Sequence, residues 1–257
     1  MHVHPTAIVA GDAQLAPGVE IGPYSVIGTE VAIGEGTVIG AHVVIAARTT
    51  LGRRNRVFQF ASLGEIPQDR KYDGKPTRTM IGDDNVVREF VTINAGTAQD
   101  RGVTTIGNGN WFLAYSHIAH DCVVGNGTTF SNNAQLAGPV SIDDHVVLGG
   151  FVGIHQFCHV GAHAFIAAGS IVLQDVPPYV TAAGYPAKPH GTNNEGLRRR
   201  GFTAEDLVAV KRAYKTLYRS SLTLEDARTQ IVASAKFAAV LAPLAAFLEK
   251  PGRGIIR

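Results

Sequence analysis

The sequence predicts an all-β parallel β-helix followed by a small α-helical domain. Three observations carry this prediction: an apolar residue recurs every six positions, a glycine often follows it, and helical spacing replaces the six-residue period near the end of the chain.

The six-residue period begins at once and covers most of the chain. One aliphatic series steps from Val3 to Leu63, a second apolar series steps from Ile106 to Val172, and Ile81, Val87 and Ile93 keep the same spacing between them. No α-helix has such a period, whereas short strands joined by tight corners do, with glycine or asparagine in the strained corner conformations. Three hexapeptides make one triangular coil, and residues 18 apart stack at about 4.7–4.9 Å. Residues 1–190 are therefore expected to form roughly nine coils.

The period is interrupted twice. Residues 64–80 and 94–105 are polar and lack the six-residue pattern. Interruptions of a repeat are where functional loops project, so we expect two external loops near 64–80 and 94–105.

A helical domain is expected over residues 191–257. Thr203-x-x-Asp206 resembles a capping box, and apolar residues follow it at helical spacing. Thr223-x-x-Asp226 begins a second helix, and Pro243 opens or kinks a third.

Composition excludes several classes of protein. The chain has 257 residues, of which 45% are apolar and 17% charged, so it is neither disordered nor a polyelectrolyte. It contains no apolar stretch of the roughly 18–20 residues that a membrane span needs. Its amino end has no pattern of a targeting segment, so we expect a cytoplasmic protein.

Cys122 and Cys158 lie two coils apart, too far for a disulfide, and are expected to be small core residues.

Charge is unevenly distributed along the chain. Residues 1–196 carry 11 Lys/Arg against 16 Asp/Glu, whereas residues 197–257 carry 12 against 5. The basic carboxyl end favours an acidic partner, although a solvated helix face explains the charge equally well.

The densest group of candidate catalytic residues surrounds Ile118. His117 and His120 flank this inward residue, and Asp121 follows directly. A carboxylate beside an imidazole fixes its tautomer, as a general base requires, although an inert exposed pair would look the same. Gly138 stacks one coil from His120, so that its amide can approach a developing oxyanion. Gln156 lies one coil further on, beside His155.

Several segments together resemble the UDP-N-acetylglucosamine O-acyltransferase family over essentially the whole chain. They are Gln68-Asp69-Arg70-Lys71-Tyr72, His117-Ile-Ala-His120-Asp121-Cys122, His155-Gln156-Phe157-Cys158, Gln174-Asp175-Val176-Pro177-Pro178-Tyr179 and Glu195-Gly196-Leu197-Arg198-Arg199-Arg200-Gly201-Phe202. The resemblance implies a left-handed coil, assembled as a homotrimer with active sites between subunits. It implies the first step of lipid A synthesis, in which a (R)-3-hydroxyacyl group passes from acyl carrier protein to UDP-N-acetylglucosamine. It implies neither a metal nor another cofactor, and no nucleic-acid partner is expected.

The same resemblance implies roles for individual residues. His120 is the general base, Asp121 orients it, and the amide of Gly138 stabilises the oxyanion. Ala168 occupies the position that limits acyl-chain length. The residues expected around the sugar nucleotide are Asp69, Lys71, His117, His155, Gln156, Asn193, Glu195 and Arg199.

The chain departs from the family pattern where Pro139 and Asn94 replace usual histidines. The preferred acyl length and the exact acceptor sugar are left open by the sequence. Within the same fold, the alternatives are another hexapeptide acyltransferase, including one that uses coenzyme A, and a γ-type carbonic anhydrase with three imidazoles around zinc. A purely structural or binding β-helix is the remaining class, and it predicts featureless outer faces.

Overall fold

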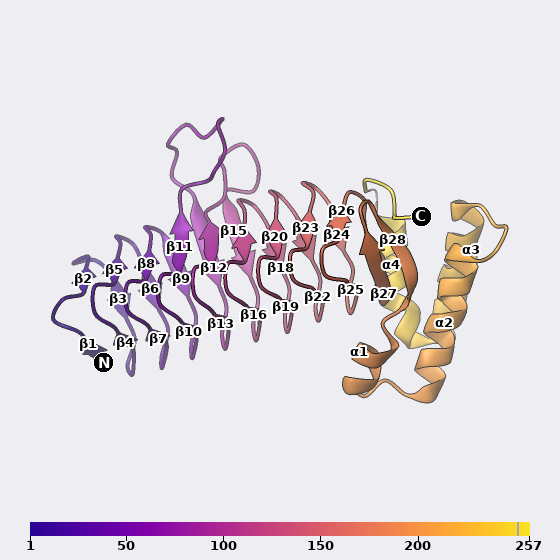
Figure 1. Ribbon diagram of the computed structural model, residues 1–257, viewed down its shortest axis with the longest axis horizontal. Helices are drawn as coiled ribbons and strands as arrows, with labels where there is room; N and C mark the ends of the chain where they lie inside the picture. Colours follow the sequence, from indigo (N-terminus) through magenta and orange to yellow (C-terminus); the bar gives the residue numbers. More distant parts are fainter. Residues whose placement is uncertain (251) are drawn as a thin grey trace.

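A computed structural model describes residues 1–250 and 252–257, and most of them form a left-handed parallel β-helix (Figure 1). Each coil contributes one short strand to each of three sheets. Neighbouring strands pair in parallel, with His2 opposite Glu20 and Val3 opposite Ile21. This register confirms the stacking that the six-residue period predicts.

The three sheets are named A, B and C in the order in which the chain meets them. Sheet A has eleven strands: β1 (His2–Val3), β4 (Glu20–Ile21), β7 (Val38–Ile39), β10 (Arg56–Val57), β13 (Val86–Val87), β16 (Trp111–Phe112), β19 (Thr129–Phe130), β22 (Val147–Leu148), β25 (Phe165–Ile166), β27 (Val180–Gly184) and β28 (Ala187–Thr192). Sheet B has nine: β2 (Ile8–Val9), β5 (Val26–Ile27), β8 (Val44–Ile45), β11 (Ser62–Glu65), β14 (Thr92–Asn94), β17 (His117–Ile118), β20 (Gln135–Leu136), β23 (Gly153–Ile154) and β26 (Ile171–Val172). Sheet C has eight: β3 (Gln14–Leu15), β6 (Ala32–Ile33), β9 (Thr49–Leu51), β12 (Arg78–Ile81), β15 (Val103–Ile106), β18 (Val123–Val124), β21 (Ser141–Ile142) and β24 (His159–Val160). The corners between sheets are called the AB, BC and CA edges.

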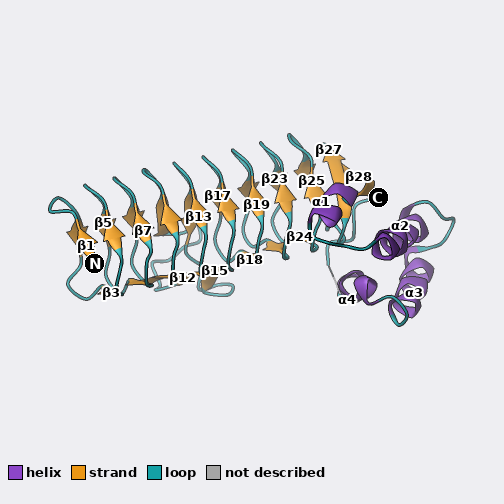
Figure 2. Ribbon diagram, turned by 90° about the horizontal axis from the view of Figure 1, so that it is seen from below, coloured by secondary structure: helices purple, strands orange, loops and turns teal. Residues whose placement is uncertain are grey.

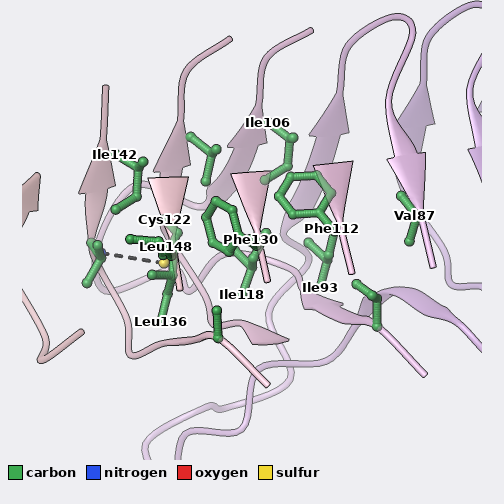
Figure 3. Close-up of a cluster of buried hydrophobic side chains, with 14 of the residues drawn as sticks. Val87, Ile93, Ile106, Phe112, Ile118, Cys122, Phe130, Leu136, Ile142 and Leu148 are labelled. Atoms are coloured by element: carbon green, nitrogen blue, oxygen red, sulfur yellow. Dashed lines mark hydrogen bonds between the residues drawn. The ribbon is translucent and has the colours of Figure 1, made fainter. Parts of the chain in front are cut away.

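The core fills the inside of the triangular coil (Figure 3). In a typical two-residue strand such as β17, the first residue faces outward and the second, Ile118, is fully buried. Larger rings occupy the middle of the stack, where Phe112 and Phe130 meet edge to face with ring centroids 5.0 Å apart. Burial of these apolar side chains is the main force that holds successive coils together.

A polar ladder runs inside the CA edge through Asn55, Asn85 and Asn110, all fully buried. The Asn85 Nδ2 donates to Oδ1 of Asn55 and to the carbonyl of Gly107, both at 3.0 Å. The backbone N–H of Asn110 donates to Oδ1 of Asn85 at 2.9 Å. The ladder satisfies polar groups that would otherwise be costly inside an apolar core.

Both expected loops project from the BC edge, next to each other (Figure 1). The strands at their bases reach further into the loops than the six-residue pattern indicates, so the loops span 66–77 and 95–102. Leu51 pairs with Ile81, and Ile81 pairs with Ile106, so the coil resumes its register after each insertion.

The coil ends in a hairpin that the six-residue period does not predict. Strand β27 pairs with β25 in parallel and with β28 antiparallel. The domain boundary expected after residue 190 falls inside β28.

The helices lie beyond this end of the coil (Figure 2). They are α1 (Asn194–Arg199), α2 (Ala204–Tyr218), α3 (Leu224–Ala235), the 3-10 turn η1 (Ala239–Leu241) and α4 (Ala242–Glu249). The capping box of Thr203 and Asp206 is present at α2, Thr223 caps α3, and Pro243 lies in the first turn of α4. Tyr214 of α2 packs into the core of the coil, so the helical domain covers the coil's open end.

Candidate active site

The candidate catalytic residues lie at the BC edge, on the coil that follows the two loops. His117 begins β17, and His120 and Asp121 form the corner before β18. The first loop leaves the same edge two coils earlier, after β11, and the second loop leaves it one coil earlier, after β14. The repeat therefore brings both loops and the His–Asp pair to one place.

His120 and Asp121 form a hydrogen-bonded pair. The Nδ1 of His120 lies 2.9 Å from Oδ2 of Asp121. The Asp121 side chain is fully buried, whereas the His120 side chain is 18% exposed. An ionised carboxylate accepts hydrogen bonds only, so it holds the proton on Nδ1 and leaves Nε2 free to accept one.

Asp121 also anchors the second loop. The amide of Thr97 donates to both carboxylate oxygens, at 3.0 and 2.9 Å, and the Thr97 hydroxyl donates to Oδ2 at 2.6 Å. The amide of Asp121 itself donates to Oγ1 of Thr104 at 2.8 Å. Asp121 adopts a left-handed backbone with φ 59°, a conformation that aspartate tolerates better than most residues. The backbone and the carboxylate are thus both fixed.

Gly138 packs directly against His120. A Cβ on Gly138 would lie 2.6 Å from the His120 carbonyl oxygen and 2.8 Å from the ring Nε2 and Cε1. Within the described part of the chain, the Gly138 amide donates no hydrogen bond. The site therefore combines a free imidazole nitrogen with a free backbone donor, the two groups that acyl transfer to a hydroxyl requires.

His117 stands beside the pair and is partly buried. Its Nδ1 lies 2.7 Å from Oγ1 of Thr92, the residue opposite it on β14. Burial lowers the pKa of His117, and the positive charge of a protonated His120 lowers that pKa further. His117 is therefore a neutral hydrogen-bonding group at pH 7.

A groove of about 450 Å³ extends from this pair along the outer face of sheet B. His117, His120, Gly138 and His155 line it. Gln68 of the first loop and Gln135 of β20 line it as well, and neither was expected from the sequence. Their positions gave some indication, because Gln68 precedes Asp69 and Gln135 stacks on His117. Nothing in the sequence indicates the role of Thr97.

The residues expected around the sugar nucleotide are not all near this groove. Asp69 and Lys71 lie in the first loop, where the Lys71 amide donates to Oδ1 of Asp69 and its carbonyl accepts from Gln99 of the second loop. Gln156 lies exposed at the BC edge, and its carbonyl accepts from the Arg253 guanidinium at 3.4 Å. His155, next to it, is also exposed.

The remaining expected residues lie at other edges of the coil. Asn193 caps α1, and its Nδ2 donates to the carbonyl of His163 at the CA edge. Glu195 and Arg199 form an exposed ion pair on α1, with Arg199 Nε 3.0 Å from Glu195 Oε1. Ala168 is exposed at the AB edge, just before β26. One copy of the chain does not bring these residues to His120.

The two positions that depart from the family pattern have structural partners. Asn94 is buried, and its Nδ2 donates to the carbonyl of Ile66 at 3.1 Å, which links β14 to the first loop. Pro139 lines a second cavity of about 430 Å³ on the far side of the BC edge, together with Phe157 and His159.

The two cysteines are free and buried, as the sequence predicts. Burial raises the pKa of the Cys122 thiol to about 12 and that of Cys158 to about 11. Both remain protonated at pH 7, so neither is a thiolate nucleophile.

The coil, the His–Asp pair and the free glycine amide define a hexapeptide-repeat acyltransferase. Residues 175–256 match the family described as UDP-N-acetylglucosamine O-acyltransferase, domain 2, and residues 12–47 and 104–138 match the bacterial transferase hexapeptide family. The acyl-acyl-carrier-protein–UDP-N-acetylglucosamine O-acyltransferase of Thiobacillus denitrificans is 62% identical over 255 residues, covering 99% of each chain. The chain belongs to the UDP-N-acetylglucosamine O-acyltransferase family.

Solved structures agree with this assignment. The Francisella novicida UDP-N-acetylglucosamine acyltransferase superposes with a TM-score of 0.97 at 44% identity, covering 99% of this chain and 94% of that one. The UDP-N-acetylglucosamine O-acyltransferase of Moraxella catarrhalis has a TM-score of 0.97 at 41% identity, covering 100% of both chains. In the part of the chain that the structure describes, no helix is long and apolar enough to cross a membrane.

Proposed function

We propose that this protein transfers a (R)-3-hydroxyacyl group from acyl carrier protein to the 3-hydroxyl of the glucosamine unit of UDP-N-acetylglucosamine, the first step of lipid A synthesis. The names of its relatives support the two substrates. The observation that carries the proposal is the position of the His120 ring, which lies between the carboxylate of Asp121 and the backbone of Gly138.

His120 is the general base of the proposed reaction. Its Nε2 takes the proton of the sugar hydroxyl as that oxygen attacks the thioester carbonyl. The resulting imidazolium is stabilised by the buried carboxylate of Asp121, which lies 2.9 Å from Nδ1. A positioned base of this kind contributes about 10²–10⁴-fold to the rate.

Gly138 supplies the oxyanion donor. As the new carbon–oxygen bond forms, the carbonyl oxygen becomes negative, and the Gly138 amide donates a hydrogen bond to it. Collapse of the tetrahedral intermediate breaks the carbon–sulfur bond. The imidazolium then returns its proton to the departing thiolate, which leaves as the thiol of the carrier protein, and neutral His120 is restored.

Side chains of suitable chemistry surround this centre. Lys71 and Arg199 can neutralise a diphosphate, whereas Asp69, Asn193 and Glu195 suit the hydroxyls and ring nitrogens of a sugar nucleotide. His117, His155 and Gln156 are placed along the BC edge for the same purpose. The basic carboxyl end, with 12 Lys/Arg against 5 Asp/Glu, favours docking of an acidic carrier protein. We propose Ala168 as a residue that limits acyl length.

A homotrimer accounts for the distribution of these residues. Lys71 leaves the coil at the BC edge, whereas Arg199 lies on α1 beside the CA edge. Because different edges of one coil face different directions, these residues line a single cleft only when a second copy supplies one of them. A closed threefold ring provides three such clefts.

The reaction is tested by incubating the protein with UDP-N-acetylglucosamine and a series of 3-hydroxyacyl carrier proteins. We expect transfer by the wild type and a loss of about 10²–10⁴ in kcat for His120→Ala. His2→Ala, at an exposed position at the other end of the coil, is the matched control. Absence of transfer with every chain length disproves the reaction, and an unimpaired His120→Ala variant disproves the base.

The shared cleft is tested by mixing two inactive variants, His120→Ala and Arg199→Ala, through unfolding and refolding. If neighbouring copies complete each site, mixed assemblies regain part of the wild-type activity. Restored activity is not expected if each copy carries a whole site. Light scattering of the wild type reports the number of copies directly.

A further inference from the structure

Thr97 is almost fully buried, although it belongs to an external loop. It is 2% exposed, whereas residues 98–100, which follow it in the second loop, are exposed. The base of this loop is narrow, because a Cβ on Gly96 would clash with backbone atoms of Gly102 and Val103. The absence of a side chain at Gly96 therefore lets the two arms of the loop pass closely and holds Thr97 against the coil.

Every polar atom of Thr97 is hydrogen-bonded. Its carbonyl accepts from the backbone N–H groups of Asp100 and Gly102, at 3.2 and 2.9 Å, which closes the turn of the loop. Its own backbone N–H and its hydroxyl donate to the carboxylate of Asp121. The loop thus presents two donors to this carboxylate from a residue that is itself held in place.

In the described part of the chain, the carboxylate of Asp121 receives hydrogen bonds from Thr97 and His120 only. Both residues share Oδ2, with the Thr97 hydroxyl at 2.6 Å and Nδ1 of His120 at 2.9 Å. A hydroxyl that donates to a carboxylate at this distance forms one of the stronger hydrogen bonds in proteins. Because the carboxylate is fully buried, solvent does not compete for its oxygens. The Thr97 hydroxyl therefore fixes the direction of Oδ2, and Oδ2 orients the imidazole.

Another His–Asp pair shows the arrangement without a residue like Thr97. Nε2 of His159 lies 2.8 Å from Oδ1 of Asp143, and the Asp143 side chain is 40% exposed. Among the residues that the structure describes, none besides His159 hydrogen-bonds to that carboxylate. A solvated carboxylate that is held on one side can turn, so it orients an imidazole less strictly than Asp121 does.

We propose that Thr97 is a positioning residue for the base. Its hydroxyl fixes the Asp121 carboxylate, so that His120 keeps its proton on Nδ1 and offers Nε2 to the acceptor hydroxyl. Thr97 touches neither substrate and acts only through Asp121. This inference rests on the proposed role of His120, and it assigns the buried base of the second loop to proton transfer.

The test compares Thr97→Val with Thr97→Ser in the transfer assay. Valine removes the hydroxyl but keeps the backbone N–H and nearly the same volume, whereas serine keeps the hydroxyl. We expect Thr97→Val to lower kcat by about 10–10²-fold and to leave KM for both substrates unchanged, because a misoriented base affects the chemical step alone. Thr97→Ser should recover most of the lost kcat. Wild-type kcat in Thr97→Val, or a serine variant as slow as the valine variant, overturns the inference.

Thr128→Val is the matched control. Thr128 is 1% exposed at the CA edge, and its backbone N–H and hydroxyl both donate to Oδ1 of Asn110 at 2.8 Å. The variant loses a buried hydroxyl bond of the same kind away from His120, so stability should fall while kcat stays at the wild-type value. An equal fall in kcat for Thr97→Val and Thr128→Val indicates a general structural effect and overturns the inference.

The tautomer of His120 separates this inference from the proposed reaction. Long-range ¹⁵N–¹H spectra of protein labelled with ¹⁵N-histidine distinguish a neutral imidazole protonated on Nδ1 from one protonated on Nε2. The signals that disappear in His120→Ala assign this ring. We expect the Nδ1–H form alone in the wild type and a mixture of both forms in Thr97→Val. An unchanged tautomer in Thr97→Val overturns the inference even if transfer occurs, and a mixture supports it even if UDP-N-acetylglucosamine is not the acceptor.

Discussion

The buried carboxylate of Asp121 accepts three hydrogen bonds from Thr97. The shortest, at 2.6 Å, runs from the Thr97 hydroxyl to Oδ2. Oδ2 of the same carboxylate lies 2.9 Å from Nδ1 of His120. One charged group therefore holds the second loop and the candidate base together. Movement of the loop and orientation of the imidazole are coupled through it.

Asp121→Asn should reduce kcat strongly while preserving the backbone, because asparagine also tolerates the left-handed conformation. The amide nitrogen of asparagine cannot accept from Thr97 or from His120, so a donor faces another donor in a buried site. We expect kcat to fall by at least about 10²-fold and stability by about 1–3 kcal/mol. Steady-state kinetics and urea unfolding measure the two effects.

Asp84→Asn is the matched control for this variant. Asp84 has the same φ of 59° but is exposed and paired with Arg54 at the CA edge. Its loss should leave both stability and kcat close to those of the wild type, because an exposed ion pair contributes little. Equal effects of the two substitutions would contradict a special role for Asp121.

Gly138→Ala should displace the His120 ring. The added methyl group would lie 2.8 Å from Nε2, on the side where the sugar hydroxyl and the oxyanion must lie. We expect kcat to fall by at least about 10²-fold, the scale of a lost oxyanion donor. Gly11→Ala is the control, since a Cβ there meets no atom within 4 Å. Normal turnover by Gly138→Ala would show that the amide of Gly138 does not contact the reacting carbonyl.

The stability of the protein should depend on the protonation of His163. Burial, the charge of a protonated His145 and the Arg200 guanidinium lower the pKa of His163 from 6.5 to about 4, against the opposing effect of Asp144. The unfolded chain therefore binds more protons than the folded one between these values. The stabilisation due to the neutral ring is fully present above pH 6.5 and is lost as the pH falls toward 4.

In His163→Phe this part of the pH dependence should disappear. The new ring keeps the contacts with Tyr179 and Phe202 but cannot be protonated. Urea unfolding at several pH values between 4 and 7 measures the slope, with His190→Phe, at an exposed position on β28, as the control. A slope equal to that of the wild type would exclude His163 as its source.

Asn85→Ala should destabilise the coil without altering its chemistry. The substitution leaves the Gly107 carbonyl and the backbone N–H of Asn110 without a partner inside the core, while the Asn55 side-chain oxygen keeps the backbone N–H of residue 85. We expect a loss of about 2–4 kcal/mol in the free energy of unfolding, because each buried unsatisfied group costs about 1–3 kcal/mol. Asn132→Ala, at an exposed corner, should cost less than about 0.5 kcal/mol. Comparable losses in the two variants would contradict the role of the ladder.

Much of the fold follows from the sequence because each coil repeats the same local geometry. The series from Val3 to Leu63 specifies which residues face inward, and the register follows from the triangular repeat. The hairpin of β27 and β28 and the short helix α1 could not be predicted in this way, since neither has the six-residue period or an extended helical pattern.

The site was predictable only in part, for the same physical reason. Stacking at 18 residues brings Gly138 to His120, and this contact is present. The bond from Thr97 to Asp121 depends on how a loop folds back, which no repeat specifies. Arg199 could be assigned only by resemblance, because it lies on α1, outside the six-residue repeat, and no stacking rule relates it to His120.

The return of the coil to its register after each loop has an evolutionary consequence. Strand partners are 30 and 25 residues apart across the two loops, yet the aliphatic positions continue to stack. Residues can therefore be inserted into either loop or deleted from it while His120 keeps its position on the next coil. Lineages can remodel the segments that touch the acceptor while the proton-transfer machinery stays in place.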